Sequence, residues 1–200
     1  MPTRLSPREI LEKLVSFPTV SRDSNLPLID WVSDYLASHG IDSHRHAKPA
    51  EPDLKAALFA HVGPEVEGGV ILSGHTDVVP VDGQAWSSDP WVLTERDGKL
   101  YGRGSTDMKG FDALAVWAMV EAQHRGVTTP LQIALSYDEE IGCMGGKDVA
   151  EAMRAALKRI VAGVKLDSPP DEAELAALVP LWRDTRAAIT ARLRDRMAEA

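Results

Sequence analysis

The sequence predicts an α/β fold: a three-layer sandwich with a mixed central sheet flanked by helices, plus a C-terminal amphipathic helical tail. One pattern in the sequence supports the sheet and its helices. Short apolar runs bounded by Gly and Pro alternate along the chain with longer segments whose apolar residues recur at helical spacing. That alternation is typical of a sheet covered by helices. The expected strands are 54–62, 69–73 and 131–137, and the expected helices are 7–16, 26–39, 108–126 and 145–159.

The helix candidates have recognisable starts or ends. Ser6 can cap the helix at 7–16, and Gly40 can end the helix at 26–39. The segment 108–126, MKGFDALAVWAMVEAQHRG, is apolar on most of its faces, which predicts a well-buried helix.

The strand candidates are separated by contrasting linkers. A turn rich in Gly, Pro and Glu joins 54–62 to 69–73, which favours two strands in direct succession. Residues 82–99 are rich in Asp, Gly, Ser, Pro and Trp and predict a long irregular loop, a type of segment that often carries function. The continuous apolar run LQIALSY, at 131–137, predicts a buried strand.

Composition narrows the class of protein. The 200 residues, 44% of them hydrophobic, suffice for one well-packed domain. The formal net charge of −8 argues against nucleic acid or membrane as the main partner, because both attract basic surfaces. A single cysteine cannot form an internal disulfide, the charged N-terminal residues do not read as a signal peptide, and no apolar stretch is long enough for us to expect a bilayer span. We therefore expect a cytoplasmic protein.

Three polar clusters follow expected strands or open an expected helix. They are His75-Thr76-Asp77, Asp107 and Asp138-Glu139-Glu140. Ligands of α/β sheets gather beyond the carboxyl ends of the strands. We therefore expect the three clusters to converge on one crevice.

The residue types in these clusters suit a pair of divalent metal ions. Imidazole and carboxylates without a thiolate form a ligand set used for zinc, cobalt or manganese. Asp107 could bridge two ions, and Asp77 can accept a hydrogen bond from the second ring nitrogen of His75, which would fix its tautomer. Because side chains alternate at a strand end, one of Glu139 and Glu140 can bind metal while the other acts as general base.

Taken singly, each cluster has a simpler interpretation. A His-x-Asp pair is usually a polar surface loop, and Asp-Glu-Glu is usually a solvated turn or a helix N-terminus. The segment GRGSTDMKG could cradle a phosphate, but it lacks the GK[ST] ending of a P-loop and the GxGxxG of a dinucleotide fold. Arg103 and Lys109 flank Asp107 and could hold a substrate carboxylate, although pairing with nearby acids is their expected role.

Three stretches of sequence carry a family resemblance. They are SGHTDVVPVDGQAWSSDPW, DGKLYGRGSTDMKGF and LSYDEEIGCMGG. They resemble the signatures of the M20 family of co-catalytic metallopeptidases and amidohydrolases, and within it those of the acetylornithine deacetylases. The resemblance runs from about residue 6 to residue 157.

The resemblance implies a site and its chemistry. His75 binds one metal ion, Asp107 bridges both, and Glu140 binds the other. Glu139 is the general base, and Asp77 orients His75. The implied cofactors are two divalent ions, zinc or cobalt, and a cis peptide bond is expected directly after Asp107.

The chain departs from the family pattern after residue 157. Family members supply a further carboxylate ligand, for which Asp167 is the candidate, although an Asp before Ser-Pro-Pro is also a common turn residue. Their late histidine ligand and their lid and dimerisation domain have no counterpart, since His124 is the last histidine here. We therefore expect an incomplete metal-binding catalytic domain at 1–165 that holds fewer ions than the two implied for the family, and a helical tail of unclear origin at 166–200.

The expected function is metal-dependent hydrolysis of N2-acetyl-L-ornithine to L-ornithine and acetate, a step of arginine biosynthesis, with activity impaired by truncation. The expected partner is a small-molecule N-acyl amino acid. Homodimers are usual for the family, but the dimerisation domain is missing. The alternatives are a succinyl-diaminopimelate desuccinylase or another N-acyl amino acid hydrolase, and a non-catalytic remnant that serves as an interaction module. The sequence assigns no substrate-binding residue.

Overall fold

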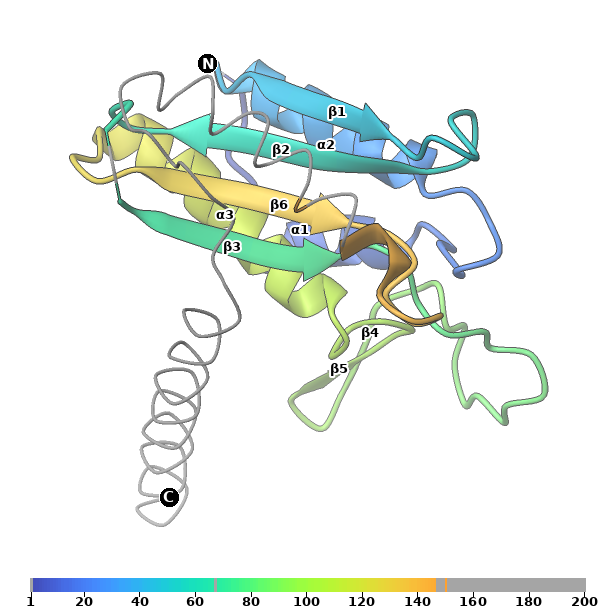
Figure 1. Cartoon of the computed structure of the whole chain (residues 1–200). Helices are drawn as coiled ribbons and strands as arrows, with labels where there is room; N and C mark the ends of the chain where they lie inside the picture. Colours follow the sequence, from blue (N-terminus) through green and yellow to red (C-terminus); the bar gives the residue numbers. More distant parts are fainter. Residues whose placement is uncertain (1, 67, 147–149, 151–200) are drawn as a thin grey trace, which may run out of the picture. The chain divides into compact units, whose positions relative to one another are not determined.

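A computed structural model describes residues 2–66, 68–146 and 150 of the chain. Within these residues a mixed sheet has the strand order β1-β2-β6-β3 (Figure 1). Its strands are β1 (Ser43–Ala47), β2 (Ala56–Val62), β3 (Val70–His75) and β6 (Leu131–Ser136). The helices are α1 (Pro7–Val15), α2 (Leu26–Ser38) and α3 (Lys109–Arg125), and a separate antiparallel hairpin joins β4 (Thr94–Arg96) to β5 (Lys99–Tyr101).

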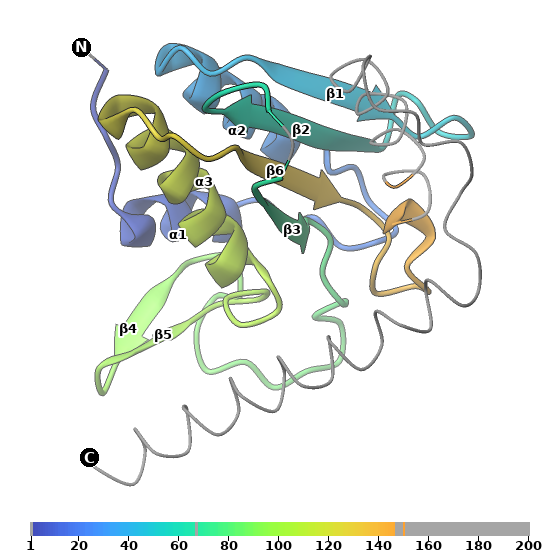
Figure 2. The same ribbon diagram turned by 60° about the vertical axis from the view of Figure 1, so that its left-hand side comes forward.

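The three helices cover one face of the sheet, as Figures 1 and 2 show. Alternate residues of β2, such as Leu58 and Val62, join the helices in the main hydrophobic core. The opposite face carries a smaller buried cluster made of Ala57, Ala134 and Tyr137. The α/β class and the mixed sheet are thus confirmed. The described residues place helices on one face alone, so they supply two of the three expected layers.

Local sequence signals account for most element boundaries. Ser6 accepts a hydrogen bond from the backbone of Glu9, whose side chain accepts from the backbone of Ser6, so that α1 starts with a complete capping box. Helix α3 ends at Gly126, whose φ of 71° is left-handed. The expected helices and strands before residue 138 are all present, with ends shifted by at most two residues.

Two elements were not expected from the sequence. Strand β1, SHRHA, has no apolar alternation and exists because it pairs with β2 in antiparallel register. The β4–β5 hairpin lies partly within the segment that we expected to be irregular, 82–99. Its turn residues, Asp97 and Gly98, both have positive φ, so the Asp-Gly signal for a two-residue hairpin was present within that loop.

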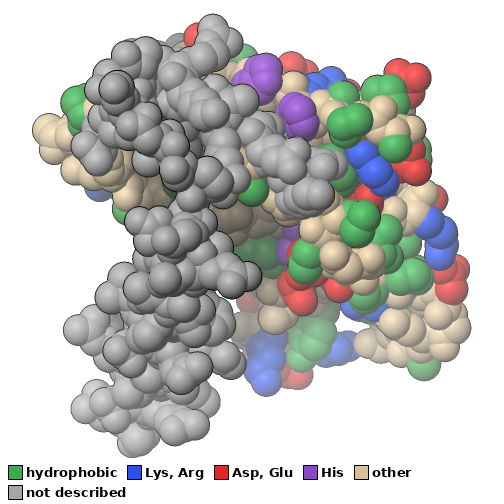
Figure 3. All heavy atoms as spheres, viewed as in Figure 1, with side chains coloured by type: hydrophobic (Ala, Val, Ile, Leu, Met, Phe, Trp, Pro, Cys, Tyr) green, Lys and Arg blue, Asp and Glu red, His purple; other side chains and the backbone are tan. Residues whose placement is uncertain are grey.

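The remaining expectations concern the C-terminal part. The helix expected at 145–159 lies largely outside the described residues, although 145, 146 and 150 are helical. The tail at 166–200 lies wholly outside them. None of the described helices is long and apolar enough to cross a bilayer. On the face drawn in Figure 3, acidic and basic side chains of the described residues are interspersed.

Candidate metal centre

Strands β3 and β6 place the first and third polar clusters next to each other. The two strands are parallel, and the last residue of β3, His75, is aligned with the last residue of β6, Ser136. The pairing continues one residue further, where the Thr76 N–H donates to the Ser136 carbonyl at 3.0 Å. His75 and Glu139 therefore leave the same edge of the sheet, at the carboxyl ends of adjacent strands.

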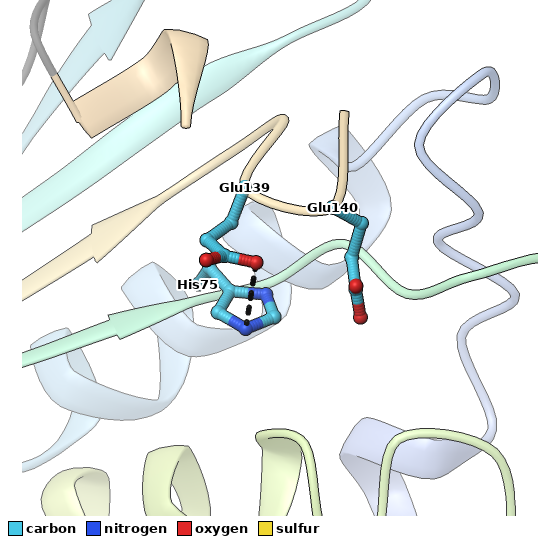
Figure 4. Close-up of side chains that lie close together, drawn as sticks. All are labelled: His75, Glu139 and Glu140. Atoms are coloured by element: carbon cyan, nitrogen blue, oxygen red, sulfur yellow. Dashed lines mark ion pairs between the residues drawn. The ribbon is translucent and has the colours of Figure 1, made fainter. Parts of the chain in front are cut away.

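His75 is buried and contacts acidic groups through both ring nitrogens. Its Nε2 lies 3.1 Å from Asp107 Oδ1 and 3.7 Å from Glu139 Oε2 (Figure 4). Its Nδ1 lies 3.0 Å from the main-chain oxygen of Asp77 and 3.5 Å from Asp77 Oδ1. We expected the Asp77 carboxylate to take the hydrogen bond from this nitrogen, whereas the shorter contact goes to the main-chain oxygen. In either case Nδ1 is engaged and Nε2 is the nitrogen that faces the carboxylates.

The Asp77 carboxylate is fully buried and binds the backbone of the third cluster. It accepts hydrogen bonds from the N–H groups of Glu139 at 3.0 Å and Glu140 at 3.2 Å, and from the Ser21 hydroxyl at 2.7 Å. Burial opposes ionisation of Asp77, but hydrogen bonds from His75, Ser21 and the two N–H groups outweigh it and lower its pKa to about 2. Asp77 is therefore a fixed negative charge beneath the site.

The two glutamates approach His75 from the loop after β6. Ligand atoms of His75, Glu139 and Glu140 all lie within 4.8 Å of one another, and Figure 4 shows the two glutamate side chains extending from this loop beside the imidazole. Burial raises the pKa of Glu140, and the negative charge of Asp107 raises it further. Carboxyl groups are thus crowded next to Nε2, an arrangement that a bound cation would stabilise.

Asp107 reaches the same imidazole from the loop before α3. Its side chain is 73% exposed, and the peptide bond between Asp107 and Met108 is cis, which confirms the expectation from the sequence. A cavity of about 270 Å³ is lined by Asp107 and Glu140 together with Val79 and residues 102–106. This cavity provides space for a small ligand next to the carboxylates.

The carboxylates around His75 favour the protonated form of its imidazole when no metal is bound, and a metal ion would displace that proton from Nε2. Burial by itself lowers the pKa of the imidazole, but Asp77 and Asp107 outweigh burial and raise its pKa to about 9. A position bordered by one imidazole nitrogen and several carboxylates therefore favours a cation. The donor set of His75, Asp107, Glu139 and Glu140, without a thiolate, fits zinc, cobalt or manganese.

The structure thus brings together five of the six residues that the sequence singled out, and Asp167 lies outside the described residues. Ser21 and Lys55 were missed. The hydroxyl of Ser21 binds Asp77, and the ammonium of Lys55 lies 3.2 Å from Asp138 Oδ1. No signal in the sequence pointed to these two residues, because they lie more than fifty positions away from their partners.

Comparison with known proteins agrees with this geometry. The model of Peptidase family M20/M25/M40 matches residues 71–184, which is more than half of the chain. The chain belongs to this family. The match extends past residue 157, where we expected the resemblance to end, and includes Asp167.

The proteins to which the chain is similar are enzymes of several kinds. An acetylornithine deacetylase of Pasteurella multocida is 38% identical over 145 residues, which cover 70% of this chain and 37% of that protein. Human carnosine dipeptidase 1 aligns with a TM-score of 0.62 at 26% identity, over 79% of this chain and 36% of that one. The metallo-carboxypeptidase Sso-CP2 of Sulfolobus solfataricus aligns with a TM-score of 0.67 at 18% identity, over 77% and 36%, which shows the fold alone. The chain spans less than two fifths of the length of these relatives.

Proposed function

We propose that the chain forms the metal-binding part of an amidohydrolase that acts on N-acyl amino acids, with N2-acetyl-L-ornithine as substrate. The observation that carries the proposal is the meeting of His75 with the carboxylates of Asp107, Glu139 and Glu140 beyond two parallel strands. The similarity to an acetylornithine deacetylase supports this substrate over others within the M20 family.

Four residues hold the metal ions in this proposal. His75 presents Nε2 while its Nδ1 is engaged by Asp77, an arrangement that orients the ring and raises its basicity as a ligand. Asp107 and Glu140 supply carboxylate oxygens to the cavity that both residues line. Asp167 is the further carboxylate ligand. Zinc or cobalt, when bound, polarises an amide carbonyl and lowers the pKa of the attacking water.

Glu139 is the general base. Its side chain is 42% exposed, so that substrate and water can reach it, while its backbone N–H is fixed by Asp77. Glu139 takes the proton from the attacking water and passes it to the amine nitrogen as the carbon–nitrogen bond breaks. A thiol proton of Cys143 lies close to the other oxygen of this carboxylate, with Sγ 3.4 Å from Oε1.

Arg103 supplies a cation for the carboxylate of an N-acyl amino acid. It lines the same cavity as Asp107 and Glu140, and within the described residues it forms no ion pair with an acid, contrary to our expectation. Its guanidinium instead donates to Gln84 Oε1 and lies over the Trp86 ring at 5.1 Å. These neutral contacts hold the side chain and leave its charge available to an anion.

The test combines metal analysis with product release. Purified chain loaded with zinc or cobalt is given N2-acetyl-L-ornithine, and acetate is measured for the wild type, Glu139→Gln and, as a control, His44→Ala on the exposed side of β1. We expect slow acetate release that requires metal, is lost in Glu139→Gln with metal still bound, and is unchanged in His44→Ala.

Other outcomes favour the alternatives. Faster release of succinate from N-succinyl-diaminopimelate would identify a desuccinylase. Absence of both metal binding and product release in a folded chain would contradict the amidohydrolase proposal and favour a non-catalytic interaction module.

A further inference from the structure

A buried ion cluster lies directly behind the two glutamates of the metal centre. The side chains of Asp138 and Lys55 are only 1% and 2% exposed, and Lys55 Nζ lies 3.2 Å from Asp138 Oδ1. This contact is an ion pair without hydrogen-bond geometry. Lys48 Nζ donates a hydrogen bond to the other oxygen, Asp138 Oδ2, at 2.8 Å. One buried carboxylate is thus held between two ammonium groups.

The cluster connects to the site through Ser21. Lys55 Nζ donates to the main-chain oxygen of Ser21 at 2.6 Å, and the Ser21 hydroxyl donates to Asp77 at 2.7 Å. Asp77 in turn accepts the N–H groups of Glu139 and Glu140. The segment from 138 to 140 is therefore held from two sides, by lysines at Asp138 and by Asp77 at the following backbone.

The backbone conformation of Asp138 is one that requires stabilising contacts. Its φ is 57°, in the left-handed region, where non-glycine residues are uncommon and Asp is among those that tolerate it. The chain leaves β6 at this point, and the N–H groups of the next two residues donate to Asp77. A buried ion pair contributes little net stability compared with apolar packing. Its role here is therefore better explained by the loop conformation that it fixes.

We propose that Asp138, Lys55 and Lys48 are positioning residues of the metal centre. By fixing the left-handed turn, they set the positions of the Glu139 and Glu140 side chains relative to His75. The inference rests on the proposed function only in that it requires a metal to bind at this site. In this proposal none of the three residues contacts the metal or the substrate.

The experiment measures cobalt binding in the full chain. The variants are Lys55→Met and Asp138→Asn, which remove one charge each at nearly constant shape. The matched controls are Asp97→Asn, an exposed aspartate with a similar φ of 52°, and Lys99→Met on β5, an exposed lysine. The readouts are the dissociation constant for cobalt, the visible absorption spectrum of the saturated protein, and circular dichroism for the fold.

We expect Lys55→Met and Asp138→Asn to weaken cobalt binding by about 10–100-fold, as loss of partners behind metal ligands does, and to change the spectrum at saturation. The controls should match the wild type. Lys48→Met provides a second variant if Lys55→Met does not fold, because Lys48 is partly exposed. Folded variants with wild-type affinity and spectrum would overturn the positioning role alone. A wild-type chain that binds no cobalt would overturn the metal centre and the positioning role together.

Discussion

Asp77 Oδ1 accepts the backbone N–H of Glu139 at 3.0 Å, although the two residues are 62 positions apart in the chain. This bond joins the loop after β3 to the loop after β6. The same carboxylate lies beside His75 Nδ1, so that one buried charge holds the imidazole and the glutamate backbone in a common geometry. Replacing Asp77 tests whether that geometry controls metal binding.

Asp77→Asn is expected to weaken zinc binding by about 10–100-fold. The amide keeps the shape but turns a hydrogen-bond donor toward groups that are themselves donors. Loss of hydrogen bonds to a buried charge should also lower the free energy of unfolding of the metal-free chain by roughly 1.5–3 kcal/mol. Competition with a chromophoric chelator and urea unfolding measure the two effects. Asp82→Asn, at an exposed aspartate, is the control, and an unchanged zinc affinity in Asp77→Asn would contradict the prediction.

Zinc is expected to stabilise the folded chain through His75. At a free zinc concentration about 100 times the dissociation constant, binding to the native state alone adds about 2.7 kcal/mol to the free energy of unfolding. His75→Ala should lose this gain because it removes the nitrogen ligand, while His44→Ala, at an exposed position, should keep it. Thermal unfolding with zinc and with a chelator provides the measurement. Equal stabilisation of both variants would place the ion elsewhere.

Asp112→Ala is expected to raise the melting temperature, and to do so more at pH 8 than at pH 5. Asp112 is buried in α3, neither of its carboxylate oxygens has a hydrogen-bond partner within the described part of the chain, and burial raises its pKa well above the ordinary value. The folded state therefore retains a proton that the unfolded chain releases. As a result, the wild type loses about 1.4 kcal/mol of stability per pH unit between the unfolded and the folded pKa.

Thermal unfolding of the metal-free chain at the two pH values tests this prediction. Asp34→Ala, at an exposed position of α2, is the control. Its effect on the melting temperature should be the same at pH 8 as at pH 5. A drop in melting temperature for Asp112→Ala of equal size at both pH values would mean that the carboxyl group is satisfied in the fold.

Gly104→Ala is expected to cost more stability than Gly98→Ala. Both glycines have left-handed φ values, 78° and 68°, so that alanine at either adds about 1–2 kcal/mol of backbone strain. A Cβ at Gly104 would lie 2.6 Å from Val78 Cγ1, whereas one at Gly98 would meet nothing within 4 Å. Gly104 also lies in the loop that carries Asp107, so zinc affinity should fall in this variant alone. Urea unfolding and zinc titration compare the two, and equal losses would contradict the argument.

Sequence alone determined the elements whose signals are local. Helix α1 is set by a cap and an apolar face within ten residues, α3 by an apolar run that ends at a glycine, and β6 by a short, largely apolar run that follows Pro130. The sequence also supplied the donor types, because imidazole and carboxylate chemistry belongs to the residues themselves. Position after a strand selected His75 and the Glu139-Glu140 pair as candidates, position at the start of a helix selected Asp107, and the family resemblance alone assigned metal binding to Glu140 rather than Glu139.

Tertiary structure alone decided what depends on distance between remote segments. Strand β1 forms because β2 offers it a pairing edge, and the parallel alignment of His75 with Ser136 sets which side chains can meet. The same packing produces the hydrogen bond from Ser21 to Asp77 and the ion pair between Lys55 and Asp138. The energies of these contacts depend on burial and on separations of a few ångströms, and neither is encoded in the spacing of residues along the chain.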